Sequence, residues 1–376
     1  MIQVPLNDLS RIDVSIRSLV VADVASIVDE GTFFRGHFTT TFEAALSSRF
    51  DGRQSTCVAN GTDALYLALA ALEVGRGDHV ATVANAGGYS TNAILHCGAV
   101  PAFVDVDPRT AQMAPDLLRD VLVNDGSISA VVVTHLYGLV GELAAIRQIC
   151  DEFEVALVED CAQSFGAIVD GTPAGTVGDL ATFSFYPTKN LGAYGDAGAV
   201  VSSTSGLDER VRSLAQYGWA SRYDITLPGG INSRIDEIQA AILLRGLELL
   251  DEQNQRRREI AMRYQDALHG DRFLIADHSD RFVAHLAVMV TDDRDADIGL
   301  LGDAGIGTGI HYPIADHRQV AWQDVCDAAS VPATESLQSR ILTLPCFPGM
   351  TDSEVDHVVG ALAALPQESS SSTPSM

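Results

Sequence analysis

Between about residue 55 and residue 205, short apolar runs alternate with helical patterns, and this alternation restricts the possible folds most strongly. Apolar runs such as PAFVDVD, AVVVTHLYG and VALVEDC are separated by stretches with helical periodicity such as NGTDALYLALAALEVG and LAAIRQICDEF. This alternation is typical of βαβ units around a mostly parallel sheet. Strands that are apolar almost throughout are expected where helices cover both faces of the sheet. The sequence therefore predicts an α/β fold.

The rest of the chain predicts a smaller second unit. A helical stretch runs from Ile235 to His269, and HLAVMVT, a helix near residues 295–304 and a last helix SEVDHVVGALAAL follow it. Because 376 residues exceed one small core, we predict a large α/β domain over residues 1–245 and a C-terminal α+β domain over residues 246–366. The polar tail, residues 367–376, is predicted to be disordered.

Charge and cysteine spacing exclude several classes of function. The formal net charge of −26 repels nucleic acids and anionic membrane surfaces. The cysteines show no C-x-x-C pair and no metal-ligand spacing, so we expect no metal site. These are Cys57, Cys97, Cys150, Cys161, Cys326 and Cys346. Neither an export signal nor a membrane-spanning stretch is apparent, which predicts a cytoplasmic protein.

A first candidate site lies in the segment NGTDAL, residues 60–65. Gly61 lets a ligand approach the backbone, and Thr62 stands at the start of a predicted helix. The unpaired N–H groups of a first helical turn form an anion site. An ordinary helix cap explains the same residues.

Asp160 ends the apolar strand VALVED, which places it at the carboxyl edge of a parallel sheet, where ligands bind. A buried carboxylate needs a partner, and a protonated heterocyclic nitrogen is suitable. The alternative is a structural aspartate that caps the next helix.

Lys189 follows the aromatic strand FSFY at a bend marked by Pro187. Partial desolvation there would favour the neutral, nucleophilic amine. Ser184, five residues earlier, can reach a phosphate oxygen. The alternative for Lys189 is an ordinary surface lysine. Taken together, the three segments offer an amine for an aldehyde, a carboxylate for a pyridine nitrogen and donors for a phosphate, and pyridoxal phosphate (PLP) carries all three groups.

Four ordered motifs make the resemblance specific. The segments NGTDAL, EDCAQSFGA, FSFYPTKNLGAYGDAGAVV and GINSRIDEIQAAIL resemble the DegT/DnrJ/EryC1/StrS family of PLP-dependent sugar aminotransferases. The similarity covers roughly residues 4 to 365. It implies PLP fold type I, with a large domain built on a mostly parallel seven-stranded sheet.

The resemblance also implies roles for individual cofactor-binding residues. Lys189 matches the Schiff-base lysine, which also moves the proton between cofactor and substrate. Asp160 matches the carboxylate on the pyridine nitrogen, and Gln163 the side chain beside the ring hydroxyl. The residues that match phosphate contacts are Gly61, Thr62 and Ser184.

Other matched residues concern the partner subunit and the substrate. Asn232 matches an asparagine that reaches the phosphate of the neighbouring subunit, which implies a homodimer with shared active sites. His311 and Tyr312 match a segment near the sugar, and His317 follows in the same loop.

One segment departs from the family pattern. The family usually has an aromatic residue that stacks on the PLP ring, in a segment like FTFVAT. Here the stretch reads ANAGGYST, and Gly87 falls at the place of the aromatic residue. Tyr89 is the candidate for the stacking role, and a tyrosine packed elsewhere is the alternative.

The resemblance implies transfer of an amino group from L-glutamate to a dTDP- or UDP-linked keto-deoxysugar. Lys189 argues against the family branch that has histidine at this position and removes oxygen from sugars. The segments QYGW (216–219) and HYPIADHRQ (311–319) favour amination at C3 over C4. Amination of a keto-inositol and a non-catalytic regulatory role are the alternatives.

Overall fold

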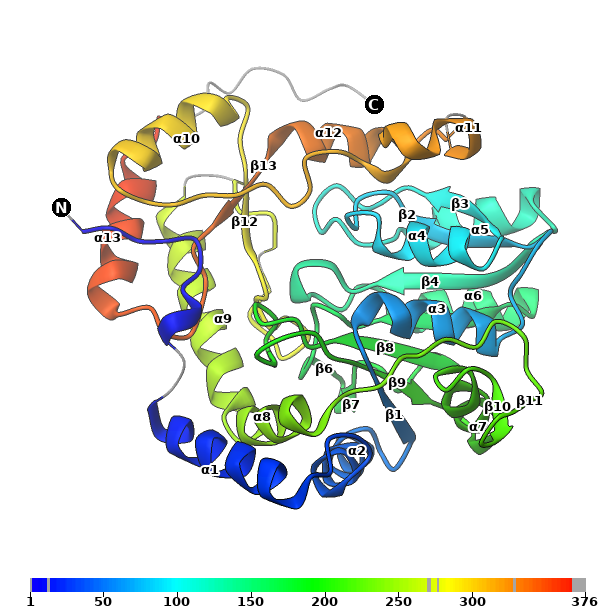
Figure 1. The fold of residues 1–376 in the computed structure, drawn as a ribbon. Coiled ribbons are helices and arrows are strands. Elements are labelled where there is room, and N and C mark those ends of the chain that lie inside the picture. Colours follow the sequence, from blue (N-terminus) through cyan, green and yellow to red (C-terminus); the bar gives the residue numbers. More distant parts are fainter. Residues whose placement is uncertain (1, 12–13, 269–271, 276, 327–328, 367–376) are drawn as a thin grey trace.

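A seven-stranded sheet forms the centre of the computed structural model (Figure 1), which describes residues 2–11, 14–268, 272–275, 277–326 and 329–366. Its order is β1-β9-β8-β5-β4-β2-β3, and β9 is antiparallel to both of its neighbours while the other pairs are parallel. The mostly parallel seven-stranded sheet predicted from the sequence is therefore confirmed. The strands are β1 (Gln54–Val58), β2 (His79–Val83), β3 (Val100–Val104), β4 (Ile128–Thr134), β5 (Ala156–Asp160), β8 (Leu180–Ser184) and β9 (Gly198–Ser202).

Helices cover both faces of this sheet, as the apolar strands require. Alternate residues of β4 show it: Ala130 and Val132 belong to one buried apolar cluster, and Val131 and Val133 to the other. The first cluster includes residues of α3 (Gly61–Ala71), α4 (Tyr89–His96) and α7 (Ser205–Leu214). The second includes residues of α2 (His37–Arg49), α5 (Pro115–Asn124) and α6 (Leu143–Phe153).

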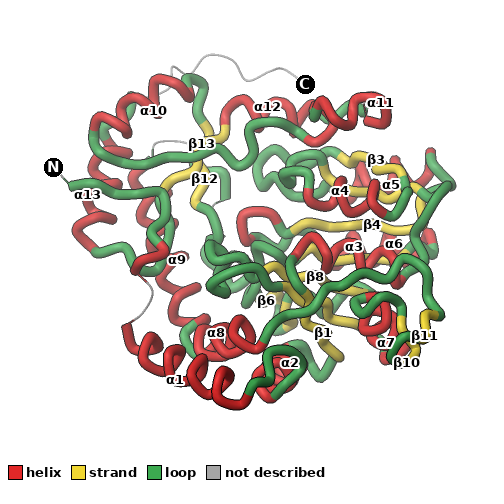
Figure 2. Tube along the Cα trace, in the orientation of Figure 1, coloured by secondary structure: helices red, strands yellow, loops and turns green. Residues whose placement is uncertain are grey.

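The helical stretch predicted from Ile235 to His269 is divided in two. Helix α8 (Glu237–Leu247) ends in a turn in which the Leu249 N–H donates to the Gly246 carbonyl, and α9 (Leu250–Ala267) begins directly after it. His269 lies outside the described residues. Helix α8 packs against α1 (Val14–Glu30) and α2, at the lower edge of the view in Figure 2.

Beyond α9 the chain forms a smaller antiparallel pair with helices beside it. Strands β12 (Ala287–Val290) and β13 (Ile341–Leu344) pair along their whole length. The helices are α10 (Arg294–Asp303), α11 (Gln323–Cys326), α12 (Pro332–Arg340) and α13 (Asp352–Ala363). Short hairpins are formed by β6 (Ile168–Val169) with β7 (Thr172–Pro173) and by β10 (Trp219–Ser221) with β11 (Asp224–Ile225). Short 3₁₀ turns lie at Leu9–Arg11, Leu136–Gly138, Asp316–Arg318 and Val320–Trp322.

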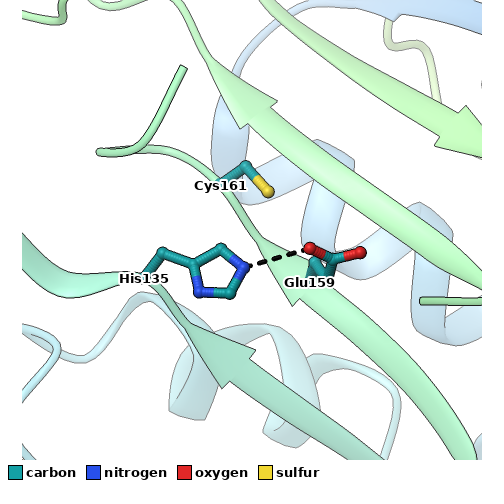
Figure 3. Close-up of side chains that lie close together, drawn as sticks. All are labelled: His135, Glu159 and Cys161. Carbon is teal, nitrogen blue, oxygen red and sulfur yellow. Dashed lines mark hydrogen bonds and ion pairs between the residues drawn. The ribbon is translucent and has the colours of Figure 1, made fainter. Parts of the chain in front are cut away.

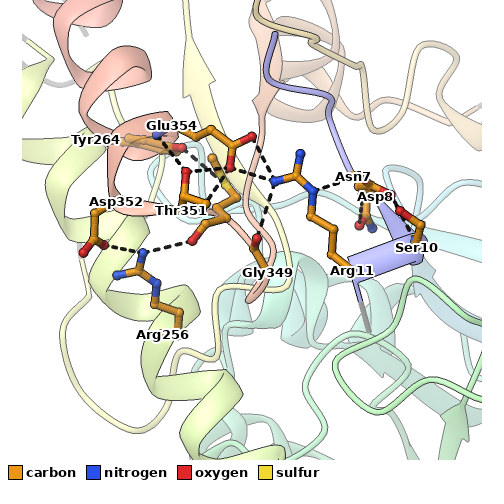
Figure 4. A network of polar contacts seen from close by, with 11 residues as sticks. Asn7, Asp8, Ser10, Arg11, Arg256, Tyr264, Gly349, Thr351, Asp352 and Glu354 are labelled. Carbon is orange, nitrogen blue, oxygen red and sulfur yellow. Dashed lines mark hydrogen bonds and ion pairs between the residues drawn. The ribbon is translucent and has the colours of Figure 1, made fainter. Parts of the chain in front are cut away.

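The N-terminal segment packs against this C-terminal part of the chain. Val4 bridges to Ile306, and the Arg11 guanidinium lies 2.7 Å from the Glu354 carboxylate (Figure 4). Glu354 also forms a capping box with Thr351 at the start of α13. The predicted domain boundary at residue 245 falls within α8, and the division into two domains stays a prediction. The predicted disordered tail, residues 367–376, lies outside the described residues.

Two further sequence expectations concern thiols and membranes. Each of the six cysteines is a free thiol. In the part of the chain that the structure describes, no helix has the length and apolar character needed to span a membrane. The cytoplasmic location stays a prediction.

Candidate active site

Three neighbouring parallel strands bring polar side chains to one edge of the sheet. Thr134 at the end of β4 is in register with Asp160 at the end of β5, and Asp160 is in register with Thr182 on β8. Ser184 ends β8, and the chain then bends through Pro187 to Lys189. Carboxyl ends of parallel strands collect ligands because the connecting loops open a crevice there.

A cavity of about 540 Å³ lies at this edge, within the usual range for cofactor sites. It brings together nine of the residues predicted from the sequence: Gly61, Thr62, Tyr89, Asp160, Gln163, Ser184, Lys189, His311 and Tyr312. The C-terminal part of the chain contributes to the same wall through His285, Leu286, His311, Tyr312, Leu344 and Cys346. The cavity is therefore built from both the sheet region and the C-terminal region.

Lys189 and Asp160 form the electrostatic centre of this cavity. Burial lowers the pKa of the Lys189 amine to about 8, although the nearby Asp160 carboxylate opposes this shift. Burial also raises the pKa of Asp160, against the Ala162 N–H bond and the charge of Lys189. The Asp160 oxygens accept hydrogen bonds from the Thr134 hydroxyl (3.3 Å) and the Ala162 N–H (3.1 Å). Both donors are neutral, so a cationic ligand atom at this carboxylate would be stabilised.

The start of α3 supplies an anion cradle. Asn60 caps the helix, and its side chain accepts the Asp63 N–H at 2.8 Å. A Cβ built on Gly61 would lie 2.6 Å from the Ser184 Cβ, so only glycine lets the helix start approach the end of β8. The first-turn N–H groups of Gly61 and Thr62 thus lie beside the Ser184 hydroxyl, at the positive end of the helix dipole.

Gln163 is held at both ends of its amide group. Its oxygen accepts the Tyr137 N–H at 2.7 Å, and its nitrogen lies 3.1 Å from the Tyr312 hydroxyl. Tyr137 in turn donates its hydroxyl to the His311 carbonyl at 2.6 Å. These contacts tie the loop after β5 to the loop that carries His311 and Tyr312.

Tyr89 begins α4 at the mouth of the cavity, with 49% of its surface exposed. Its ring meets the Tyr312 ring edge-on, with centroids 6.1 Å apart. Gly87 and Gly88, directly before it, both have positive φ, which explains why this loop contains two glycines.

Two predicted residues lie outside this cavity. His317 is buried, and its Nε2 lies 2.9 Å from the Glu335 carboxylate. Asn232 is exposed and pairs through its backbone with Gln216, on the segment that leads to β10. The structure does not bring these two side chains to Lys189 within one chain.

Comparison with known proteins decides the family. The model of the DegT/DnrJ/EryC1/StrS aminotransferase family matches residues 14–363. The chain belongs to this family.

Two relatives and one solved structure illustrate the likeness. The chain is 37% identical to the dTDP-3-amino-3,4,6-trideoxy-alpha-D-glucose transaminase of Micromonospora megalomicea subsp. nigra, over 92% of this chain and 94% of the relative. It is 36% identical to the dTDP-3-amino-3,6-dideoxy-alpha-D-galactopyranose transaminase of Aneurinibacillus thermoaerophilus, over 96% and 98%. The structure of NtdA from Bacillus subtilis with bound cofactor PMP aligns with a TM-score of 0.90 and 29% identity, covering 96% of this chain and 85% of that one.

These comparisons confirm the predicted family, the fold class and the cofactor of this aminotransferase. The residues in the cavity fit PLP on their own chemistry. They offer a buried amine of lowered pKa, a buried carboxylate with neutral donors, and a helix start beside a serine hydroxyl. An aldehyde, a pyridinium nitrogen and a phosphate are the matching ligand groups.

A second polar cluster lies behind Asp160 in this DegT/DnrJ/EryC1/StrS family member. His135, Glu159 and Cys161 are close together and buried (Figure 3). The Glu159 oxygens already accept the N–H groups of Gly175, Val177 and Gly178 and contact His135 at 3.1 Å. With its lone pairs used in this way, the carboxylate is a loop anchor rather than a metal ligand.

Sequence reasoning missed His285 and Asn190. His285 lines the cavity with Lys189, and its Nδ1 lies 2.8 Å from the Asn190 side-chain oxygen. A histidine directly before the apolar run LAVMV was the available signal, because a buried histidine needs polar partners. Those partners lie about a hundred residues earlier in the chain, so spacing alone does not show them.

Proposed function

We propose that this chain transfers an amino group from L-glutamate to a keto-deoxysugar linked to dTDP or UDP, with Lys189 as the cofactor lysine. The observation that carries the proposal is the Lys189 amine, buried with Asp160 in one cavity and lowered in pKa to about 8. The names of the two relatives, both dTDP-sugar transaminases, support the substrate class.

Pyridoxal phosphate, when bound, supplies an aldehyde that captures amines and a ring that takes up electrons. The protein provides a base at the Lys189 Nζ. With a pKa of about 8, this amine is mostly protonated near neutral pH but releases its proton far more readily than an ordinary lysine. It can therefore move a proton to and from a substrate carbon, which is the work of a general acid and base.

The other cavity residues would orient the cofactor. Asp160 would keep the ring nitrogen protonated, because a buried carboxylate stabilises a proton on its partner. Gln163 would hold the ring hydroxyl. The phosphate is assigned to three residues that share the start of α3 and the end of β8: Gly61, Thr62 and Ser184.

Tyr89 is assigned to the face of the cofactor ring, and His311 and Tyr312 to the sugar side of the cavity. Within one chain His317 lies away from this group, packed on Glu335. Asn232 is assigned to the phosphate of a partner subunit, because its side chain is exposed and outside its own cavity. The assignment requires a homodimer with shared active sites.

We infer amination at C3 in preference to C4. Both relatives carry the amino group at position 3 in their names, in agreement with the expectation from residues 216–219 and 311–319. The sugar pocket itself decides this choice, since the cofactor residues serve either position equally.

Borohydride reduction tests the role of Lys189. Lys189 is the only lysine of the chain, so reduction of the purified holoenzyme should fix the cofactor to the peptide that contains residue 189. Mass spectrometry reads the labelled peptide. A Lys189→Ala variant should lose turnover and keep its fold by circular dichroism. Label on another peptide, or turnover near normal in the variant, would refute the assignment.

A substrate screen tests the acceptor. Purified enzyme is supplied with glutamate and, in turn, dTDP- and UDP-linked 3-keto and 4-keto sugars and a keto-inositol, and products are identified by mass and NMR. A 3-amino nucleotide sugar is the expected product. A 4-amino product overturns the C3 preference, and an aminocyclitol favours the alternative acceptor. If no acceptor reacts and reduction labels no lysine, the regulatory alternative holds.

A further inference from the structure

His285 lies beside Lys189 in the same cavity, two residues before the start of β12. Only 6% of its surface is exposed, so each ring nitrogen needs a defined partner. Its Nδ1 lies 2.8 Å from the side-chain oxygen of Asn190, the residue that follows Lys189 in the chain. His285 is thereby tied to the bend that carries the cofactor lysine.

A chain of two buried amides determines which ring nitrogen carries the proton. The Asn254 nitrogen donates to the Phe165 carbonyl at 3.0 Å. The Asn190 nitrogen donates to the Val283 carbonyl at 3.0 Å and to the Asn254 oxygen at 2.7 Å. Because backbone carbonyls only accept, both amide orientations are determined. The Asn190 oxygen therefore accepts, and the His285 Nδ1 donates.

The second ring nitrogen, Nε2, carries no proton. Burial, together with the nearby cationic groups of Lys189 and Arg257, holds the pKa of His285 well below its usual range. The ring is therefore neutral, with its one proton on Nδ1. Nε2 is left as a lone-pair acceptor on a side chain that lines the cavity.

We propose that His285 is a positioning residue whose Nε2 accepts a hydrogen bond from the Lys189 amine and holds it beside the cofactor. The inference rests on the proposed function of Lys189. An amine that moves a proton must stay within reach of the reacting carbon, and a fixed acceptor would hold it there. A neutral imidazole does so without adding positive charge next to the amine.

The tautomer is measured on the holoenzyme labelled with ¹⁵N-histidine. A long-range ¹H–¹⁵N spectrum near neutral pH should show one ring with a protonated Nδ1 and an unprotonated Nε2 that disappears in His285→Gln. The matched control is His278→Gln, because His278 is exposed and lies outside the cavity. It should remove a different signal and leave turnover unchanged. A protonated Nε2 on His285, with or without a proton on Nδ1, overturns the proposal.

Kinetics separate positioning from a purely structural role. His285→Leu should lower kcat by roughly tenfold to a hundredfold with KM little changed, since a misplaced catalytic group costs on the order of that factor. The acid limb of its kcat profile should move to lower pH, because the lost acceptor stabilises the ammonium form of Lys189. His285→Gln, which keeps an acceptor oxygen, should recover most of the rate. A Leu variant with unchanged kcat and unchanged acid limb overturns the proposal.

The two proposals fail in different ways. If borohydride labels no Lys189, the proposed function fails while the histidine spectrum still reports the tautomer. If Lys189 is labelled and Gln and Leu variants of His285 are equally slow with the wild-type pH profile, the positioning role alone is refuted.

Discussion

The ring of Tyr312 occupies the space into which a side chain at Gly87 would project. A Cβ built on Gly87 would lie 2.9 Å from both Cε1 and Cζ of that ring. The hydroxyl at the far end of the ring lies 3.1 Å from the Gln163 amide nitrogen. The glycine that departs from the family pattern is therefore the steric counterpart of an aromatic residue from the C-terminal region.

Replacement of Gly87 by alanine should weaken cofactor binding as well as stability. Its φ of +78° costs an alanine about 1–2 kcal/mol, and the new methyl group must also displace Tyr312. Gly31→Ala is the matched control, because Gly31 has φ +69° and nothing within 4 Å of its Cβ position. Urea unfolding should show strain in both variants, and titration with PLP should show reduced affinity only at position 87. Equal affinities would contradict the steric pairing.

The buried amine of Lys189 should destabilise the cofactor-free protein. Its pKa falls from 10.5 to about 8, so the unfolded chain binds this proton more tightly than the folded chain. Lys189→Met should therefore stabilise the apoprotein by on the order of 3 kcal/mol at pH 7. The gain should shrink as the pH rises from about 8 to 10.5, where the wild-type amine becomes neutral in both states. Urea unfolding of both proteins at pH 7 and pH 10 measures it, and an equal gain at both values would contradict the assignment to charge.

The sheet region was predictable because the local pattern of apolar residues indicates which strands are buried. Apolar runs such as residues 130–133 and 157–158 are buried on both faces, and helices cover both sides of them. The break between α8 and α9 was not predictable from the sequence. The turn at Leu249 is closed by a backbone hydrogen bond to Gly246, and the helical pattern of the sequence continues across it. A single tight turn does not interrupt that pattern enough to be read from the sequence.

The candidate site was predictable where residues end strands or start helices. Asp160, Ser184 and Gly61 occupy such positions, and the sheet alone brings them together. His285 depends on an amide chain through Asn190, formed by tertiary packing between distant segments. Loop conformation likewise decides that His311 and Tyr312 reach the cavity while His317, five residues later, packs on Glu335.

Glu237 should be a strong contributor to stability. Its buried carboxylate reaches from the start of α8 to the start of α2, where it accepts the N–H groups of Gly36 (2.9 Å), Phe38 (2.8 Å) and Thr39 (3.1 Å) and the Thr39 hydroxyl. Glu237→Gln removes the negative charge at the N-terminus of α2. It also places an amide NH₂ group, a hydrogen-bond donor, opposite backbone N–H groups that need an acceptor. We expect a loss of about 2–3 kcal/mol in the free energy of unfolding.

Glu248→Gln provides the control for this cap. Glu248 is exposed and directly follows the last residue of α8, with a 3.7 Å contact to Arg245. An exposed pair of this kind contributes at most about 1 kcal/mol. Chemical unfolding of both variants gives the comparison, and equal losses would show that the Glu237 contacts do not stabilise α2.

Asp316 should make stability depend on pH near neutrality. It is fully buried against α4, where the Thr91 hydroxyl donates to one of its oxygens at 2.6 Å. Burial raises its pKa from 3.8 to about 7, against that hydrogen bond. The folded chain therefore holds the proton more tightly than the unfolded chain, and stability contributed by the protonated form declines as the pH rises from about 4 to about 7.

Asp316→Asn should remove this dependence on pH. The amide has the shape of the protonated acid, and its oxygen can still accept the hydrogen bond from the Thr91 hydroxyl. The variant should be more stable than the wild type at pH 8 and not at pH 4. The exposed Asp324→Asn replacement is the control and should change stability little at either pH. Urea unfolding at pH 4 and pH 8 measures the difference in the free energy of unfolding between each variant and the wild type. If Asp316→Asn gives the same change at pH 4 and pH 8, folding does not raise the pKa of Asp316 over this range, and burial is balanced by partners of the charged form other than Thr91.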